Sequence, residues 1–270
     1  MILRKGLLPN KRLGQNFLVN QGIIKKIIVA AALTKTDTVL EIGPGHGALT
    51  FTLAKEAGKV VAIEKDRALA EILRNELAER NITNVEIIEG DILSFLDDPH
   101  SPLPPRYHVV ANIPYYLTSA LIRQLLELTR PPERILLTIQ KEVAQRIAAH
   151  SGKESILSLA VKFYADARIL FPISRGSFSP VPNVDSAVIE IIPRKESSPI
   201  PPKAFFAVMK AGFLAPRKKL PGNLAKGLSL NKEKIVALLS ELGINPNARP
   251  EQLALVQWIS LAQHLQAHLA

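Results

Sequence analysis

The stretch that decides the fold is Val39-Leu40-Glu41-Ile42-Gly43-Pro44-Gly45-His46-Gly47. An apolar run typical of a β-strand meets three glycines at alternate positions, and residues of helix-forming character follow. Glycine accepts backbone conformations that other residues resist and lets a ligand approach the main chain closely. The first amides of a helix are unpaired donors. The pattern favours a strand, a turn and a helix around a polar ligand; the alternative is a tight turn without a ligand.

A second apolar run, Val60–Ile63, ends at Glu64. In dinucleotide-binding folds an acidic residue roughly twenty positions after the glycines accepts hydrogen bonds from ribose hydroxyls. The dinucleotide spacing Gly-x-Gly-x-x-Gly is absent, because the glycines fall at 43, 45 and 47. We therefore expect a nucleoside-bearing ligand other than NAD.

Apolar runs alternate with helical segments over most of the chain. The expected strands are 38–42, 60–64, 85–89, 108–111, 135–139 and 187–192. This alternation predicts an α/β fold, a doubly wound, mostly parallel Rossmann-like sheet with helices on both faces. Beyond the prolines of 193–202 the pattern is helical only. The expected divisions are a basic N-terminal arm over 1–20, the sheet domain over 21–195 and a small all-helical C-terminal domain over 196–270.

The composition excludes several kinds of site. The chain has 270 residues and no cysteine, which rules out disulfides, thiolate zinc sites and cysteine nucleophiles. The six histidines show no metal-binding spacing, so no metal is expected. No apolar run approaches the length of a membrane span, and the N-terminus lacks a secretory segment. We expect a soluble cytoplasmic protein with no membrane partner.

The formal charge of +10 is concentrated at the two ends of the chain. Residues 1–26 carry six basic groups and no acidic one, and residues 193–270 carry 11 Lys+Arg against 4 Asp+Glu, a net of +7. The body between them is therefore slightly acidic, at about −3. Two basic ends suit a polyanionic partner held by its phosphates. The alternative is that these lysines only keep the protein soluble.

A second informative motif is Asn112-Ile113-Pro114-Tyr115, which follows the fourth expected strand. Open parallel sheets bind ligands at the carboxyl ends of their strands. Proline forces Ile113 into an extended shape that directs main-chain carbonyls outward. The Asn112 side chain adds an acceptor and Tyr115 a flat face, a combination suited to an exocyclic amino group on a stacked ring. A strand-terminating turn with a core tyrosine is the alternative.

Asp91 follows Gly90 at the end of the third expected strand. Its carboxylate there can accept a hydrogen bond from the adenine amino group of a bound nucleoside. Capping of the next helical turn is an equally good interpretation of the same residue.

These segments, in this order, resemble the S-adenosylmethionine-dependent methyltransferases that act on adenine amino groups. The chain is more closely similar to the small-subunit ribosomal RNA adenine N6,N6-dimethyltransferase family. Further motifs of that family stand at Lys11–Leu18, Gln140–Arg146, Phe178–Val188 and Arg249–Leu253. The resemblance covers nearly the whole chain.

The resemblance implies S-adenosyl-L-methionine as the cofactor and a role for each matching position. It places cofactor binding at Gln15, Asn16, Leu18, Gly43, Gly45, Gly47, Glu64, Lys65, Asp91, Ile92 and Asn112. It places catalysis at Asn112, Pro114, Tyr115 and Phe178, where the amide and the carbonyls around Pro114 hold the target amino group and the two rings sandwich the base. The expected RNA contacts are Lys11, Arg12, Arg217, Lys218, Lys219 and Lys226.

The chain departs from the family pattern at a few positions. Asn183 stands where a lysine is usual, and Ala215-Pro216 precede Arg217 where a glutamine and arginines are usual. These changes affect expected RNA contacts and leave the expected chemical centre intact.

The implied activity is dimethylation of two adjacent adenosines in a hairpin loop near the 3′ end of small-subunit (16S-type) rRNA during ribosome biogenesis. The expected partner is that rRNA within a 30S-type particle, bound by a monomer. The alternatives are a large-subunit rRNA adenine methyltransferase of the resistance type and a non-catalytic rRNA-binding assembly or transcription factor of the same fold. Any enzymatic interpretation requires one cavity that joins the glycine turn to the asparagine-proline-tyrosine corner.

Overall fold

The computed structural model of the chain describes residues 14–148, 154–195, 198–215 and 217–268. The chain forms two compact units. The first comprises Met1–Gln145 with Ala165–Pro193, and the second comprises Arg146–Tyr164 with Arg194–Ala270.

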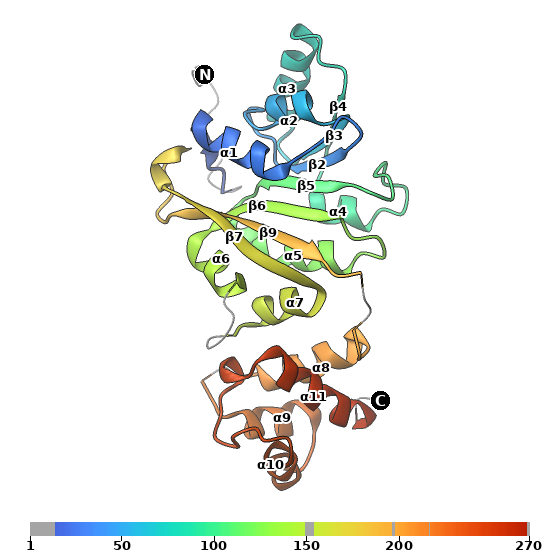
Figure 1. Cartoon of the computed structure of the whole chain (residues 1–270), viewed down its shortest axis with the longest axis vertical. Helices are drawn as coiled ribbons and strands as arrows, with labels where there is room; N and C mark the ends of the chain where they lie inside the picture. Colours follow the sequence, from blue (N-terminus) through green and yellow to red (C-terminus); the bar gives the residue numbers. More distant parts are fainter. Residues whose placement is uncertain (1–13, 149–153, 196–197, 216, 269–270) are drawn as a thin grey trace. The chain divides into compact units, whose positions relative to one another are not determined.

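The first unit is built on a seven-stranded sheet (Figure 1). In spatial order the strands are β4 (Val85–Glu89), β3 (Lys59–Glu64), β2 (Thr38–Ile42), β5 (His108–Asn112), β6 (Arg134–Gln140), β9 (Ser186–Pro193) and β7 (Ala165–Ile173). The first five run parallel, and β9 runs antiparallel to both of its neighbours. The predicted α/β, mostly parallel sheet is confirmed.

The register brings the functional motifs to one edge of the sheet. Ile42 at the end of β2 pairs with Ile63 on β3, and Glu64 pairs with Glu89 at the end of β4. Asn112, the last residue of β5, pairs with Thr138 on β6. The residues that follow these strand ends therefore share the carboxyl edge, where open parallel sheets bind ligands.

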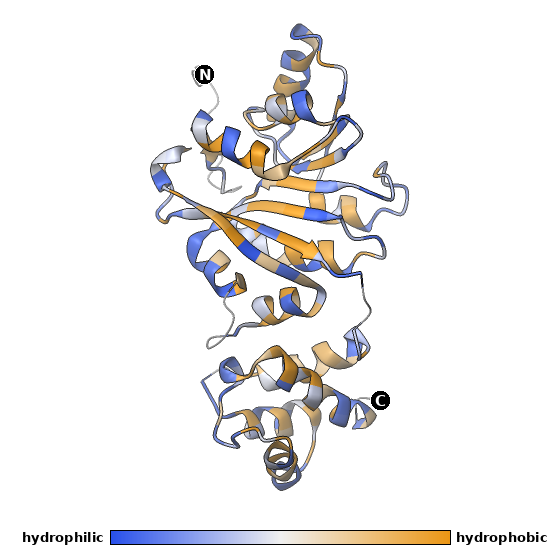
Figure 2. Cartoon of the chain, viewed as in Figure 1, coloured by the Kyte–Doolittle hydropathy of each residue, from blue (hydrophilic) through white to orange (hydrophobic). Residues whose placement is uncertain are grey.

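Both faces of the sheet are buried, which explains why its strands are continuous apolar runs. On one face α1 (Gln21–Ala31) and α2 (Thr50–Glu56) contribute Ile24, Ile27 and Leu53 to a core shared with the strand residues Val39 and Val60. The oppositely directed Leu40, Val61 and Val109 are also fully buried. Figure 2 shows the same strands as mostly hydrophobic. The remaining helices of this part of the chain are α3 (Arg67–Glu79), α4 (Ile92–Asp97), α5 (Thr118–Glu127) and α6 (Lys141–Ala148).

The sequence pattern did not reveal three strands. The nine-residue strand β7 forms one edge of the sheet. Two short strands, β1 (Phe17–Leu18) and β8 (Phe178–Ser179), pair antiparallel as a separate small sheet. Residues 17–18, expected to lie in an arm with no regular structure, are therefore tied to a segment about 160 residues away in the chain.

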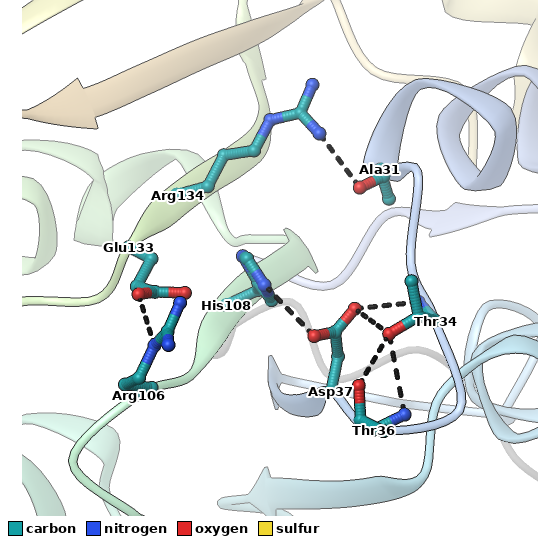
Figure 3. Close-up of polar contacts among 8 residues, drawn as sticks. All are labelled: Ala31, Thr34, Thr36, Asp37, Arg106, His108, Glu133 and Arg134. Atoms are coloured by element: carbon teal, nitrogen blue, oxygen red, sulfur yellow. Dashed lines mark hydrogen bonds and ion pairs between the residues drawn. The ribbon is translucent and has the colours of Figure 1, made fainter.

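Polar side chains pair with one another at the amino edge of the sheet (Figure 3). Asp37 Oδ2 accepts hydrogen bonds from the Thr34 main-chain N–H at 2.7 Å and from its hydroxyl at 2.9 Å. The Nε2 of His108, on β5, lies 3.7 Å from Asp37 Oδ1. Arg134 donates to the Ala31 carbonyl at 2.8 Å. These contacts fix the α1–β2 connection and join it to β5 and β6.

The second unit is helical, as the pattern predicted. Its helices are α7 (Ile156–Tyr164), α8 (Pro202–Gly212), α9 (Leu220–Leu228), α10 (Lys232–Glu241) and α11 (Leu255–Leu265). They share a core around Phe205, Met209, Leu239 and Trp258. Residues 146–164 group with these helices, although they fall inside the range 21–195 expected for the first domain. Among the described residues, no helix has the length and apolarity that a membrane crossing requires.

Candidate active site

A cavity opens at the carboxyl edge of the sheet in the first unit. Its walls come from the segment before β1, the glycine turn after β2, the ends of β3 and β4, the corner after β5, and β8. The lining residues are Gly14, Gln15, Asn16, Phe17, Ile42, Gly43, Gly45, Ile63, Glu64, Lys65, Gly90, Asp91, Ile92, Asn112, Ile113, Pro114, Tyr115, Tyr116, Leu117 and Phe178. The predicted common cavity between the glycine turn and the asparagine-proline-tyrosine corner is confirmed.

The glycine turn depends on conformations that side chains disfavour. Gly43 and Gly45 have φ angles of 66° and 56°, in the left-handed region. A Cβ atom on Gly43 would meet nothing within 4 Å, so the main chain faces open space in the cavity. A Cβ on Gly45 would lie 2.8 Å from the ring of Phe17. Glycine at 43 therefore leaves room for a ligand, and glycine at 45 leaves room for the arm.

Glu64 fastens the glycine turn to the start of α3. Its Oε2 accepts a hydrogen bond from Gly45 N at 3.0 Å, and its Oε1 accepts one from Asp66 N at 2.9 Å. Burial raises the pKa of this carboxyl, although main-chain hydrogen bonds from Asp66, Gly45 and Lys65 oppose the rise. Since a carboxylate has about four acceptor sites, the group retains capacity toward the cavity.

Asp91 and Lys65 form an ion pair at the cavity, with Lys65 Nζ 2.7 Å from Asp91 Oδ2. The hydrogen bond from Lys65 lowers the pKa of Asp91, which keeps this carboxyl ionised. The other oxygen, Oδ1, accepts from Leu93 N at 2.9 Å and caps α4. The helix-cap interpretation of Asp91 is thus confirmed, and the same residue also lines the cavity. Ile92, the next residue, adds a buried apolar wall.

The corner after β5 has a fixed geometry. Asn112 Nδ2 donates to the main-chain carbonyl of Asn16 at 3.0 Å. The Tyr115 hydroxyl lies 2.7 Å from Ser186 Oγ, at the start of β9. Burial raises the pKa of Tyr115, so its hydroxyl stays protonated at neutral pH. Phe178 is 2% exposed and lines the cavity with Tyr115.

The structure leaves some expected site residues outside the cavity. Leu18 and Gly47 do not line the cavity. Leu18 is buried in the core of the first unit, and a Cβ on Gly47 would collide with Leu73 and Phe51. Packing explains both positions, so the cofactor roles expected for them gain no support from the described geometry. His46, whose ring packs 4.4 Å from that of Phe17, is not a lining residue either.

The expected RNA contacts fall into two groups. Lys11 and Arg12 lie outside the described residues. Arg217, Lys218, Lys219 and Lys226 are exposed on the second unit, and Lys219 Nζ donates to Asn247 Oδ1 at 2.7 Å. None of these four lines the cavity of the first unit.

Sequence reasoning missed two aromatic residues of the cavity. Tyr116 lines it and is 61% exposed, and Phe17 lines it beside Gly45. Both lie directly next to residues that the motifs indicated. Their adjacency was the available signal, but the direction of their rings depends on contacts that a linear motif does not show.

Comparison with known proteins agrees with this geometry. The family model described as "Ribosomal RNA adenine dimethylase" matches residues 7–267. A protein named "Ribosomal RNA small subunit methyltransferase A" from Dehalococcoides mccartyi is 40% identical over 94% of this chain and 88% of its own length. A protein of the same name from Geobacillus thermodenitrificans is 39% identical over 98% of this chain and 94% of its own length.

Two solved structures share the fold. A dimethyladenosine transferase from Plasmodium falciparum superposes with a TM-score of 0.78 at 27% identity, covering 93% of this chain and 98% of that one. The 23S rRNA methyltransferase ErmE superposes with a TM-score of 0.71 at 28% identity, covering 93% and 100%. The sheet is therefore a Rossmann-like methyltransferase fold. By its fold, its carboxyl-edge cavity and a match that spans almost its entire length, this chain belongs to the ribosomal RNA adenine dimethylase family.

Proposed function

We propose that this protein transfers methyl groups from S-adenosyl-L-methionine to the exocyclic amino groups of two adjacent adenosines of small-subunit rRNA, dimethylating each. The observation that supports this most directly is the single cavity that joins the glycine turn to Asn112 and Tyr115. A methyl donor and an acceptor base must meet in one enclosed space, and this cavity has recognition groups for both.

The donor set fits a cofactor with a nucleoside and a charged amino acid part. The open main chain at Gly43 leaves space for the methionine portion, and the fixed carboxylate of Glu64 can accept from ribose hydroxyls. Asp91 and the apolar Ile92 suit the polar edge and the face of an adenine ring. When bound, the cofactor supplies an electrophilic methyl group on a sulfonium.

Asn112 is the residue that we expect to hold the target nitrogen. The lone pair of an adenine amino group is delocalised into the ring, which makes the nitrogen a poor nucleophile. Acceptance of its hydrogens by Asn112 Oδ1 and a main-chain carbonyl near Pro114 favours a pyramidal nitrogen with a directed lone pair. Alignment of this kind supplies several kcal/mol, up to roughly 7–11 in ideal cases.

Tyr115 and Phe178 supply the aromatic walls for the base. A stacked or paired adenine cannot enter such a cavity and must be flipped out or taken from a loop. Aromatic stacking on single-stranded bases is worth about 1–3 kcal/mol per base. The Tyr115 hydroxyl is held by Ser186 and stays protonated, so this residue acts by its ring and not as a base. The methylated nitrogen is acidic enough to release its proton to water.

The decisive experiment is methyl transfer from isotope-labelled cofactor to unmodified small subunits, with the modified nucleotides mapped by mass spectrometry. Asn112→Ala should lower kcat by about 10²–10³-fold, the loss typical when one preorganised polar group is removed. The matched control is Asn84→Ala, because Asn84 is a structural asparagine of the same unit that donates to the Ala54 and Ala57 carbonyls. Unchanged turnover in Asn112→Ala would contradict the assigned role.

The basic residues of the second unit are the proposed phosphate-binding groups. Replacing Arg217, Lys218 and Lys219 together with alanine should weaken RNA binding at every sequence. It should also reduce the slope of log affinity against log salt by about 0.7–0.9 for each phosphate interaction that the substitutions remove. The control replaces the exposed Lys35, Lys55 and Arg130, which lie in the first unit outside the two basic ends. Equal weakening by the two triple substitutions would show only a general charge effect.

The two alternatives make different predictions in the same assay. A large-subunit enzyme would label 23S rRNA and leave the small subunit unlabelled. Relatives that carry the small-subunit name match this chain at about 40% identity over nearly its whole length, which favours the small subunit. A non-catalytic factor would bind RNA without transfer, and the complete cavity disfavours it. Parallel reactions with naked 16S-type rRNA and with 30S-type particles would identify the substrate form. The monomeric state and cytoplasmic location stay predictions.

A further inference from the structure

The side-chain amide of Asn112 can serve the proposed reaction in only one of its two orientations. The Oδ1 atom can accept a hydrogen bond from an adenine amino group. The Nδ2 group cannot, because it is itself a hydrogen-bond donor. In this structure Nδ2 donates to the Asn16 carbonyl at 3.0 Å. Within the part of the chain that the structure describes, Oδ1 accepts no hydrogen bond. The main chain before β1 therefore selects the orientation that leaves the acceptor available.

The Asn16 carbonyl is held from both sides. Before it, the Asn16 side chain donates to the Gly14 carbonyl at 3.2 Å. After it, Phe17 pairs with Ser179 in the small sheet of β1 and β8. The Phe17 ring ties this segment to the glycine turn, because its centroid lies 4.4 Å from that of the His46 ring and a Cβ on Gly45 would lie 2.8 Å from the Phe17 ring.

From these contacts we propose that Phe17 is a positioning residue for the methyl acceptor site: by packing on the glycine turn it holds the Asn16 carbonyl against Asn112 and so sets the orientation of that amide. The inference rests on the proposed function and adds a residue to it. It also explains why residue 45 is a glycine, because any side chain there would displace the Phe17 ring that holds the segment before β1.

The first test reads the amide directly and requires no activity. In 15N-labelled full-length protein, the Asn112 side-chain NH2 signals are assigned by their loss in Asn112→Asp. We expect Phe17→Ala to shift them toward the positions of a solvent-exposed amide, and Phe17→Leu to restore part of the shift. Ile28→Ala, a core truncation in α1 of the same unit, should leave them in place. Unmoved Asn112 signals in folded Phe17→Ala would overturn the proposal.

The second test is a double-mutant cycle in methyl transfer. Phe17→Ala should lower kcat by about 10–100-fold, with KM for RNA little changed, because small misplacements of reacting groups cost this much. In Asn112→Asp either orientation of the side chain places an oxygen toward the target amino group. Adding Phe17→Ala to this variant should therefore lower kcat little further. Equal fold-changes in the two backgrounds would show that Phe17 acts independently of Asn112. If Asn112→Asp has no measurable turnover, the Asn112 side-chain NMR signals of Phe17→Ala decide whether Phe17 sets the orientation of the amide. Absence of transfer by the wild type would instead refute the proposed function and leave the amide result standing.

Discussion

The pKa values of two buried glutamates in one sheet are shifted in opposite directions. Glu190 on β9 is 1% exposed, and Glu41 on β2 is 2% exposed. Glu190 accepts from Arg134 Nε at 2.6 Å and pairs with Arg168, whereas Oε2 of Glu41 has no partner among the described residues. Burial alone would raise both pKa values. The two arginines reverse the effect and lower the pKa of Glu190, while burial and the nearby Glu64 raise the pKa of Glu41 to about 8.

The contrast extends to the two edges of the sheet. At the amino edge Asp37 accepts from Thr34 and lies 3.7 Å from His108, and Arg134 donates to the Ala31 carbonyl, as Figure 3 shows. At the carboxyl edge main-chain groups hold Glu64 and Asn112, and both side chains line the cavity with acceptor capacity left. Polar side chains whose hydrogen bonds are made within the protein stabilise the fold, and those that line the cavity keep acceptors for a ligand.

A large loss of stability is expected from breaking the best-paired buried charge. Glu190→Gln should lower the free energy of unfolding by about 3 kcal/mol, because it leaves Arg134 and Arg168 without a counter-charge. Urea denaturation would measure the loss. Glu86→Gln breaks the exposed pair with Lys59 and should cost less than about 1 kcal/mol. Similar losses of unfolding free energy in the two variants would contradict the distinction between a buried ion pair and an exposed one.

At the carboxyl edge the corresponding change should affect binding more than folding. Glu64→Ala removes the acceptor of Gly45 and Asp66 and should weaken binding of S-adenosylmethionine by about 1.5–3 kcal/mol, roughly 10–150-fold in Kd. Calorimetry would measure it. Glu89 pairs with Glu64 in the sheet but lies outside the cavity, so Glu89→Ala is the matched control. An unchanged Kd in Glu64→Ala would remove this residue from the site.

Glu41 should make the stability of the protein depend on pH between 4.5 and 8. Its pKa rises from 4.5 to about 8 on folding, so the folded protein keeps a proton that the unfolded chain releases. Stability should therefore fall as pH rises from 4.5 to 8, by at most about 1.4 kcal/mol per pH unit. Glu41→Gln should lose this dependence and exceed the wild type in melting temperature at pH 8, by more than it does at pH 5. Parallel melting curves of the two proteins across this range would contradict the prediction.

The smallest effect is expected at the amino edge. Bonds from Thr34 and His108 outweigh the burial of Asp37 and lower its pKa below 3.8. This stabilisation is present above the unfolded pKa and is lost as pH falls through the folded one. Asp37→Asn should cost about 1 kcal/mol at pH 7, and the difference from the wild type should be smaller at pH 3. Urea midpoints at the two pH values would test it, and an equal difference at both would contradict it.

Most of the sheet could be predicted because buried parallel strands are long apolar runs. Strand β7 could not, since an edge strand tolerates Asp166, Arg168 and Pro172, which break such a run. The glycine turn and the Asn112 corner were predictable from local motifs at strand ends. The bond between Asn112 and Asn16 and the unpartnered Oε2 of Glu41 were not, because both depend on neighbours that are distant in the sequence.

The grouping of α7 with the C-terminal helices affects how the protein can be divided. A cut after Pro193 would keep α7 but remove α8, whose Phe205 stacks on Phe163 at 4.2 Å. The released N-terminal fragment would expose that ring together with Leu159 to water, an apolar patch prone to aggregation. Modular exchange of the helical unit between relatives therefore has to transplant two separate pieces of gene, and a single-breakpoint chimera should fail to stay monodisperse.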